Sequence, residues 1–369
     1  MARRGMRIKC SPSPFGEGGR RKPTGWGEPG DTRPAPASPS RPHPALRATL
    51  PKMGRESYEP FMPLPPVNTF AGNPLDRAGD RRDDPAWLVE QAARPEALAM
   101  LLWEGRPLIE DHADGPRLAW LSMGHARDLA PDRQAFLGLW RDAPVFAVEI
   151  EGSIDPAEGP VRGLGGFHEM RAAAAMLSGV EAAMAGTAKS LFDWRRRHGF
   201  CSACGSATRD ACGGWKRVCE ACGTEHFPRV DPVVIMLAVH EGPDGPRCLL
   251  GRQAAWPAGR MSALAGFLEP GESIEEACAR EIAEEAGLTV TAVRYHSSQP
   301  WPFPSQLMIG LFCVVDSDEA RPDQTELEAV AWLTRDEARA CLAETHAIKP
   351  PPPIAIARTL LEAWAQGRD

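Results

Sequence analysis

Residues 266–288 read GFLEPGESIEEACAREIAEEAGL and combine a glycine-rich loop with an acidic helix pattern. In this stretch Glu281, Glu284 and Glu285 are spaced i, i+3 and i+4, so a helix places their three carboxylates on one face. Gly287 is a typical C-terminal end for that helix. Like charges this close repel one another unless hard cations such as Mg²⁺ or Mn²⁺ lie among them. The stretch therefore predicts a divalent-metal site.

The simpler interpretation of the same residues is a solvated acidic helix face, which is what most carboxylate clusters are. The frame around the helix argues against it. Gly266 and Gly271 allow the loop to approach the helix closely, and Glu272 and Arg280 are eight residues apart and able to pair across that loop. We therefore expect a divalent-metal site and not a solvated helix face.

Two CxxC pairs lie upstream of this stretch, separated by 14 residues, and consist of Cys201, Cys204, Cys219 and Cys222. This spacing predicts two turns that place four thiolates tetrahedrally around one structural Zn²⁺ per chain, with no open position for catalysis. The alternative, redox-active CxxC motifs, needs a thioredoxin-like βαβ setting that the pattern lacks. We expect the other six cysteines to be tail or core thiols: Cys10, Cys212, Cys248, Cys278, Cys313 and Cys341.

The composition of the 369 residues is that of a globular protein, with an uneven distribution of charge. Residues 1–53 hold 11 Lys and Arg against 3 Asp and Glu, together with 10 Pro and 7 Gly, while the rest of the chain is acidic. An acidic surface disfavours broad nucleic-acid binding through the phosphate backbone. The sequence contains neither an apolar stretch of membrane-spanning length nor a secretory leader, which makes the cytoplasm the expected location.

The order of patterns along the chain predicts an α+β protein of three folded parts after a tail. Residues 1–55 should form a disordered Pro/Gly-rich tail, and Met53 is a candidate translation start. Residues 56–197 should be an α+β N-terminal domain with a linker helix, 198–228 a zinc ribbon, and 229–369 the catalytic domain. In the N-terminal domain we expect helices at 86–103 and 170–197 and strands at 117–123 and 145–150. In the catalytic domain we expect strands at 233–239, 248–252, 261–268, 289–295, 307–315 and 330–333, and helices at 273–286 and 354–365.

Residues 266–288 fit the pattern GX₅EX₇REUXEEXGU, where U is aliphatic, at every defined position, and the chain here resembles the Nudix hydrolases. The resemblance implies an α/β/α sandwich for the catalytic domain and hydrolysis of a diphosphate by metal-activated water. It further implies that Glu281 and Glu285 are the principal metal ligands and that Glu284 is a ligand or proton acceptor. Three more roles are implied: the carbonyl of Ala265 and the carboxylate of Glu326 as further ligands, and Arg280 as the residue that orients Glu272.

Ten residues beyond this box the chain reads SQPWPFPSQ, from Ser298 to Gln306. Alternating prolines favour an extended backbone, and Trp301 and Phe303 offer flat rings that could stack on a nicotinamide or adenine base. The segment resembles the SQPWPFPxS signature of the NADH pyrophosphatase branch of the Nudix family, with Gln306 where the signature ends in Ser. The residues that the resemblance implies in substrate binding are Gln299, Pro300, Trp301, Pro302, Phe303, Pro304, Ser305, Gln306, Phe227, Phe267 and the backbone of Ala357. Gly214 stands where some relatives have an acidic substrate contact.

The resemblance thus implies hydrolysis of NADH and NAD⁺ to nicotinamide mononucleotide and AMP, removal of NAD caps from RNA 5′ ends, and a homodimer. Two alternatives stay open. One is a Nudix enzyme that acts mainly on ADP-ribose or other nucleoside diphosphate derivatives. The other is a zinc-ribbon RNA-binding protein with an inactive Nudix fold.

Overall fold

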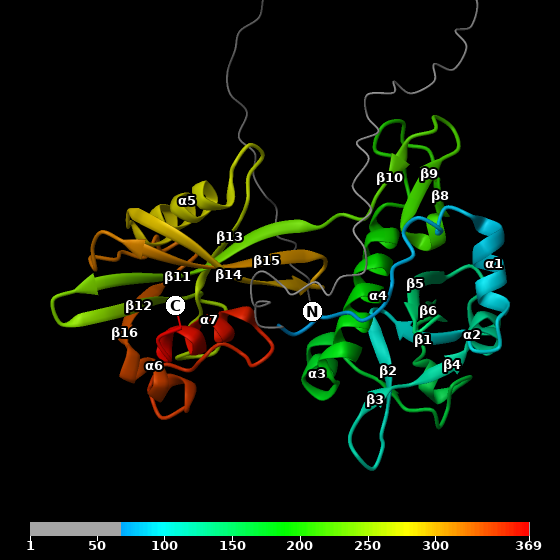
Figure 1. Cartoon of the computed structure of the whole chain (residues 1–369), viewed down its shortest axis with the longest axis horizontal. Helices are drawn as coiled ribbons and strands as arrows, with labels where there is room; N and C mark the ends of the chain where they lie inside the picture. The colour runs from blue at the N-terminus through cyan, green and yellow to red at the C-terminus, as the bar shows by residue number, and fades with distance from the viewer. Residues whose placement is uncertain (1–67, 369) are drawn as a thin grey trace, which may run out of the picture. The chain divides into compact units, whose positions relative to one another are not determined.

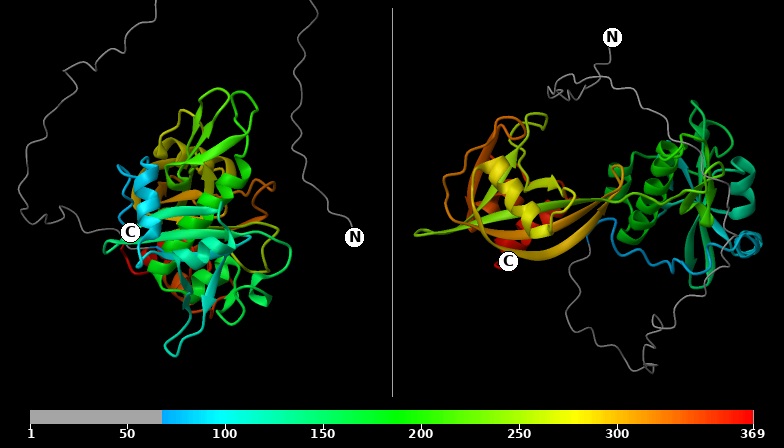
Figure 2. Two further views of the ribbon diagram at one scale, coloured as in Figure 1. Left: turned by 90° about the vertical axis from the view of Figure 1, so that its right-hand side faces the viewer. Right: turned by 90° about the horizontal axis from the view of Figure 1, so that it is seen from above.

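The structure is a computed structural model that describes residues 68–368 (Figures 1 and 2). The predicted tail, Met53 and Cys10 lie outside the described residues. In the described part of the chain, every helix is too short or too polar to cross a membrane.

The N-terminal domain is built on a sheet in which two neighbouring central strands run parallel. The path of the sheet is β3-β2-β1-β6-β5, with β4 added to β1 and β7 to β2, and β1 and β6 are the parallel pair. The strands are β1 (Leu98–Trp103), β2 (Arg106–Glu110), β3 (Arg117–Leu118), β4 (Trp120–Ser122), β5 (Gln134–Trp140), β6 (Ala143–Ile150) and β7 (Gly166–Phe167). The helices are α1 (Pro85–Ala93), α2 (Met123–Leu129), α3 (Met170–Met176) and α4 (Gly179–Arg197), with a 3-10 turn at Pro156–Glu158.

Both faces of this sheet are buried. Along β1, Ala99 and Leu101 belong to one core cluster, which also holds Trp87 of α1, while Met100 and Leu102 belong to another, which also holds Met184 of α4. Alternate residues of a strand point to opposite faces, so the strand is apolar throughout. Such a continuous apolar pattern is also typical of a buried helix, so the pattern alone does not distinguish the two.

The predicted helix at 86–103 is wrong in its second half, because α1 ends at Ala93 and 98–103 form β1. The physical reason is Pro95, which disfavours the helical conformation of the residue before it. Arg94 accordingly adopts an extended backbone with φ −66° and ψ 137°.

The predicted helix at 170–197 is interrupted once, between α3 and α4. Ser178 begins a new helix because its hydroxyl accepts a hydrogen bond from the Glu181 backbone N–H, while the Glu181 side chain bonds back to Ser178. This reciprocal arrangement satisfies donors that a helix N-terminus leaves unpaired.

The zinc ribbon is a small antiparallel sheet of three strands, β8 (Thr208–Ala211), β9 (Lys216–Cys219) and β10 (Glu225–His226). A 3-10 turn at Cys212–Gly214 joins the first two strands. Cys212 is partly exposed there, so it is not the core thiol that we predicted, whereas Cys248, Cys278, Cys313 and Cys341 are buried as expected.

The C-terminal domain is an α/β/α sandwich, as predicted. Its sheet follows the order β14-β15-β11-β12-β16, with β13 paired to β11, and β11 and β15 run parallel. Val234, Met236 and Ala238 of β11 pack with α5, while alternate residues of the same strand pack with α6 and α7. The strands are β11 (Asp231–Gly242), β12 (Gly245–Arg252), β13 (Leu264–Phe267), β14 (Val290–Trp301), β15 (Gln306–Val315) and β16 (Ala329–Thr334), and the helices are α5 (Ile274–Ala286), α6 (Arg335–Leu342) and α7 (Ile356–Ala365).

Candidate active site and zinc centre

Helix α5 carries the three carboxylates that the sequence places on one face. Ser273 caps its N-terminus in a reciprocal pair with Glu276, and Gly287 ends it in the left-handed conformation with φ 67°. The helix packs on the sheet, so Glu285 and Glu281 are only 4% and 9% exposed. Glu284 faces solvent. The amphipathic pattern therefore buries two acidic side chains together with the apolar ones.

Gly266 of β13 provides the space for Glu281. A Cβ atom on Gly266 would lie 1.8 Å from the Glu281 carboxylate, which is far inside van der Waals contact. Strand β13 is held in place by its pairing with β11, in which Gly266 lies opposite Val234. Only glycine therefore fits between the strand backbone and this carboxylate.

The two buried carboxylates have raised pKa values. Burial, followed by the charges of Glu281, Glu326 and Asp323, raises the pKa of Glu285 to about 8. Burial also raises the pKa of Glu281, against the opposing effect of Arg280. One Glu285 oxygen, Oε2, is buried and has no hydrogen-bond partner among the described residues. A buried, unpartnered oxygen among like charges is the environment that a divalent cation stabilises.

Arg280 connects the loop to the helix, as the spacing predicted. Its Nε and Nη2 donate to the two carboxylate oxygens of Glu272 at 2.6 and 2.9 Å. The same guanidinium donates to Glu281 and Glu284 and, at 2.8 Å, to the Phe267 carbonyl. The hydrogen bonds from Arg280 to Glu272 lower the pKa of Glu272 to about 2.

A cavity of about 990 Å³ brings together residues from distant parts of the chain. Five of the residues assigned to the site from the sequence line it: Ala265, Glu285, Gln299, Trp301 and Ala357. Sequence reasoning missed other lining residues, including Arg171 of α3, Trp256 and Arg260. Nothing in the local pattern around these three indicates a site, because they reach the cavity only through the tertiary fold.

The signature segment is extended only over its first part. Strand β14 includes residues 299–301, but residues 302–305 form a turn before β15, and the Phe303-Pro304 bond is cis. The prediction of an extended backbone throughout is therefore wrong after Trp301. The turn is held by α4, because Lys189 donates to the Pro302 carbonyl at 2.9 Å and Ser190 to the Pro304 carbonyl at 3.3 Å.

The Gln299 amide is used inside the protein. Its Nε2 donates to the carbonyls of Thr69 and Ile354 at 3.0 and 2.8 Å, and its Oε1 accepts from the Ile356 backbone N–H at 2.9 Å. Ile356 is the first residue of α7. Gln299 therefore fixes the backbone around the cavity and does not offer a free amide to it.

The two rings of the signature segment pack against the N-terminal domain. Trp301 and Phe303 are 5.0 Å apart and each lies 6.0 Å from Phe70, in edge-to-face contacts. The Arg171 guanidinium lies 3.9 Å from the Phe303 ring centroid. Trp301 also lines a second cavity, of about 550 Å³, together with Pro300, Pro302, Ser305 and Gln306.

Phe227, Phe267 and Glu326, which the sequence also assigns to the site, lie outside both cavities. Phe227 and Phe267 are 63% and 53% exposed, and neither lines the two cavities. Glu326 is exposed, and its negative charge contributes to the raised pKa values of Glu281 and Glu285. Gly214 has a φ of 91°, and a Cβ atom on it would lie 3.2 Å from the Ala135 side chain, so an acidic residue at this position would be strained.

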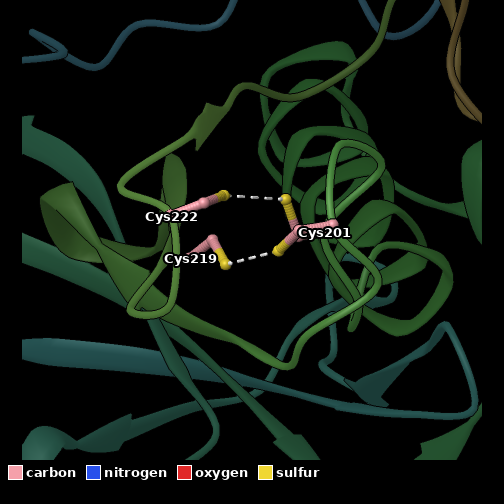
Figure 3. A group of neighbouring side chains, drawn as sticks. Cys201, Cys219 and Cys222 are labelled. Atoms are coloured by element: carbon pink, nitrogen blue, oxygen red, sulfur yellow. Dashed lines mark hydrogen bonds between the residues drawn. The ribbon is translucent and has the colours of Figure 1, made fainter. Parts of the chain in front are cut away.

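The four paired cysteines form a compact cluster, which Figure 3 shows with Cys201, Cys219 and Cys222 labelled. All four Sγ atoms lie within 4.8 Å of one another. The Cys201–Cys222 and Cys204–Cys219 sulfur distances are 3.7 and 3.5 Å. Four thiolates bound tetrahedrally at 2.3 Å from zinc would be about 3.8 Å apart. The cluster therefore fits a structural Zn²⁺.

Comparison with known proteins assigns all three folded parts. Residues 230–354 match the NUDIX domain, 96–194 the NADH pyrophosphatase-like rudimentary NUDIX domain, and 196–227 the NADH pyrophosphatase zinc ribbon domain. The chain belongs to the Nudix hydrolase family, and its N-terminal domain is a second, rudimentary copy of the Nudix domain.

Two relatives give the match in detail. The chain is 35% identical over 339 residues to the NAD-capped RNA hydrolase NUDT12 of Macaca fascicularis, covering 80% of this chain and 73% of the relative. It is 43% identical over 205 residues to the NAD-capped RNA hydrolase NudC of Mycobacterium bovis, covering 53% of this chain and 64% of the relative. Among solved structures, a NUDIX hydrolase from Nitrosomonas europaea is 23% identical with a TM-score of 0.37, covering 46% of this chain and 91% of that chain.

Proposed function

We propose that this protein hydrolyses the diphosphate bond of NADH and NAD⁺ to nicotinamide mononucleotide and AMP, and that it also removes NAD caps from RNA. The observation that carries the proposal is the cavity that joins the buried Glu285 carboxylate to Trp301 of the signature segment. The two relatives described above, both NAD-capped RNA hydrolases, support the same substrates.

The residues present fit a catalytic divalent cation. Glu281, Glu285, Glu326 and the Ala265 carbonyl would hold it, and Glu285 Oε2 is a buried oxygen without a hydrogen-bond partner among the described residues. When bound, Mg²⁺ or Mn²⁺ would neutralise diphosphate charge and provide a water nucleophile near neutral pH. Both metals use oxygen ligands, so the activity assay with each metal decides between them.

Hydrogen bonds within the chain hold the carboxylates and the loop of this site in position. Arg280 holds the Glu281 carboxylate in place and fixes the loop through Glu272 and the Phe267 carbonyl. Glu284 is exposed and ion-paired with Arg280 at 3.0 Å, and its role as a metal ligand or proton acceptor stays a prediction. Trp301 offers an apolar face in the cavity for a base of the dinucleotide.

The alternative of an RNA-binding zinc ribbon is disfavoured by its ion pairs. The three basic residues between the outer cysteines are all engaged: Arg209 with Glu220, Lys216 with Asp83 and Glu225, and Arg217 with Asp210. The paired carboxylates offset the positive charge that binding to a phosphate backbone requires. The intact carboxylates further disfavour an inactive Nudix fold.

Other parts of the proposal rest on the sequence. The domain boundaries at 197/198 and 228/229 are our proposal, and the boundary at 55/56 lies outside the described residues. The homodimer and the cytoplasmic location stay predictions. Sedimentation of the purified protein tests the dimer directly.

One assay tests the proposed function. The purified protein, with Mg²⁺ or Mn²⁺, is given NADH, NAD⁺, ADP-ribose and NAD-capped RNA, and the products are separated by chromatography. We expect AMP and nicotinamide mononucleotide from the first two and 5′-monophosphate RNA from the last. Faster turnover of ADP-ribose than of every NAD substrate would favour the general Nudix alternative, and no turnover at all would favour the inactive fold.

A further inference from the structure

Arg260 is a charged residue of the catalytic cavity that is neither a proposed metal ligand nor a residue that positions one. It lines the cavity together with Ala265, Glu285 and Trp301. Its Nε atom is buried and has no hydrogen-bond partner among the residues that the structure describes. Within residues 68–368, the Arg260 side chain also lacks an ion pair or a ring contact. A buried charged donor without a partner costs free energy unless something else binds it.

The backbone around Arg260 is fixed even though its side chain is not. The Lys349 N–H donates to the Gly259 carbonyl at 2.8 Å, and the Met261 N–H donates to the Lys349 carbonyl at 3.2 Å. The Arg260 N–H itself donates to the Pro257 carbonyl at 3.1 Å. The guanidinium therefore lines the cavity from a backbone that these hydrogen bonds hold in place.

The other residues of the cavity provide few partners for the Arg260 guanidinium. The nearby wall contains Pro351, Pro352 and Pro353, which have neither a charge nor a backbone N–H. The other arginine of the cavity, Arg171, is already engaged, with a Glu169 oxygen at 3.8 Å and the Phe303 ring at 3.9 Å. Arg260 is thus the arginine of this cavity that is left to bind an anionic ligand.

We propose that Arg260 binds a phosphate oxygen of the substrate, an inference that rests on the proposed function. A guanidinium recognises phosphate through two parallel hydrogen bonds. Two sources of that oxygen exist: the diphosphate, which all the dinucleotides share, and the phosphodiester that follows the adenosine only in NAD-capped RNA. Arg260 precedes Ala265 by five residues, a chain length that spans at most about 17 Å. This reach leaves both sources open.

Kinetics with two substrates distinguishes the sources. Arg260→Met, which keeps the apolar stem, should lower kcat/KM about ten- to 150-fold, because a hydrogen bond to a charged group is lost. An equal loss for NADH and a short NAD-capped oligonucleotide assigns the diphosphate, and a loss confined to the oligonucleotide assigns the phosphodiester. Arg260→Lys should recover part of the loss. The matched control is Lys349→Met, which removes a neighbouring exposed cation outside the cavity and should match the wild type.

Binding without divalent cations separates this inference from the proposed function. AMP and adenosine 3′,5′-bisphosphate are titrated calorimetrically into wild type and Arg260→Met, with Arg260→Gln replacing the Met variant if that variant fails to fold. Weaker binding of either probe by the variant supports the proposal even if NADH is not hydrolysed. Wild-type affinity for both probes, together with unchanged kcat/KM on both substrates, would overturn it.

Discussion

At the scale of single residues, the site depends on a close approach between a glycine and a carboxylate. Glu281 occupies the space that a side chain on Gly266 would fill. Strand β13 is held on the other side by its pairing with β11, which lies in the middle of the sheet. The chemistry of Glu281 is therefore controlled by a residue with no functional group.

We expect Gly266→Ala to lower turnover by at least about a hundredfold, since the new methyl group must displace Glu281 or the strand. The measurement is kcat on NADH over a range of Mn²⁺ concentrations. Gly179→Ala, at a helical glycine with open space around it, is the matched control and should leave kcat unchanged. Normal turnover and normal metal dependence in Gly266→Ala would show that Glu281 does not act from a position against Gly266.

Glu285→Gln should separate activity from stability. The amide keeps the size of the side chain but removes a charge that burial and neighbouring carboxylates oppose. We expect turnover to fall by orders of magnitude, while the thermal unfolding temperature without divalent metal stays the same or rises. Both are measured on the same preparation. Near wild-type turnover at saturating metal would reject Glu285 as a ligand.

At the scale of secondary-structure elements, the sequence predicts the acidic helix and the four-cysteine cluster better than the other helices and strands. The helix at α5 and the four-cysteine cluster depend on short, fixed spacings, and the structure has both. Strand β1 was missed because a strand buried on both faces has the same continuous apolar pattern as a buried helix. Arg171 and Arg260 were missed because only the tertiary fold brings α3 and the loop before β13 to the cavity.

The zinc ribbon is an element whose stability depends on a ligand. Its three strands, β8, β9 and β10, are shorter than the usual strand of about five or six residues and offer little apolar surface to bury. Cys219→Ser should therefore lower the zinc content of the purified protein and its unfolding temperature, because structural zinc contributes directly to folding. Atomic absorption and calorimetry measure the two quantities. A variant that keeps one zinc per chain and melts like the wild type would contradict the four-cysteine assignment. Cys212→Ser, outside the cluster, is the control.

At the scale of the whole molecule, the signature segment connects the two Nudix-related domains. Trp301 contacts Phe70 and the N-terminal core cluster, yet it also lines the catalytic cavity. Gly186 of α4 lies against Phe70 and Pro302, where a Cβ would come within 2.8 Å of the Phe70 ring. The rudimentary domain thus contributes to the substrate cavity through packing, and any change at Trp301 combines a binding effect with a structural one.

Trp301→Ala separates these two effects through a ratio. If the indole stacks on the nicotinamide, its loss should cost about 1–3 kcal/mol of binding, or roughly a five- to 150-fold fall in kcat/KM for NADH. ADP-ribose lacks the nicotinamide, so its kcat/KM should fall less. Trp140→Ala, which removes an indole at the surface, controls for general destabilisation. An equal fall for both substrates would mean that Trp301 contacts the shared adenosine half or only supports the cavity wall, because packing does not distinguish the ligands. No fall for either substrate would reduce the signature to a contact between domains and remove the stacking argument for NADH over ADP-ribose.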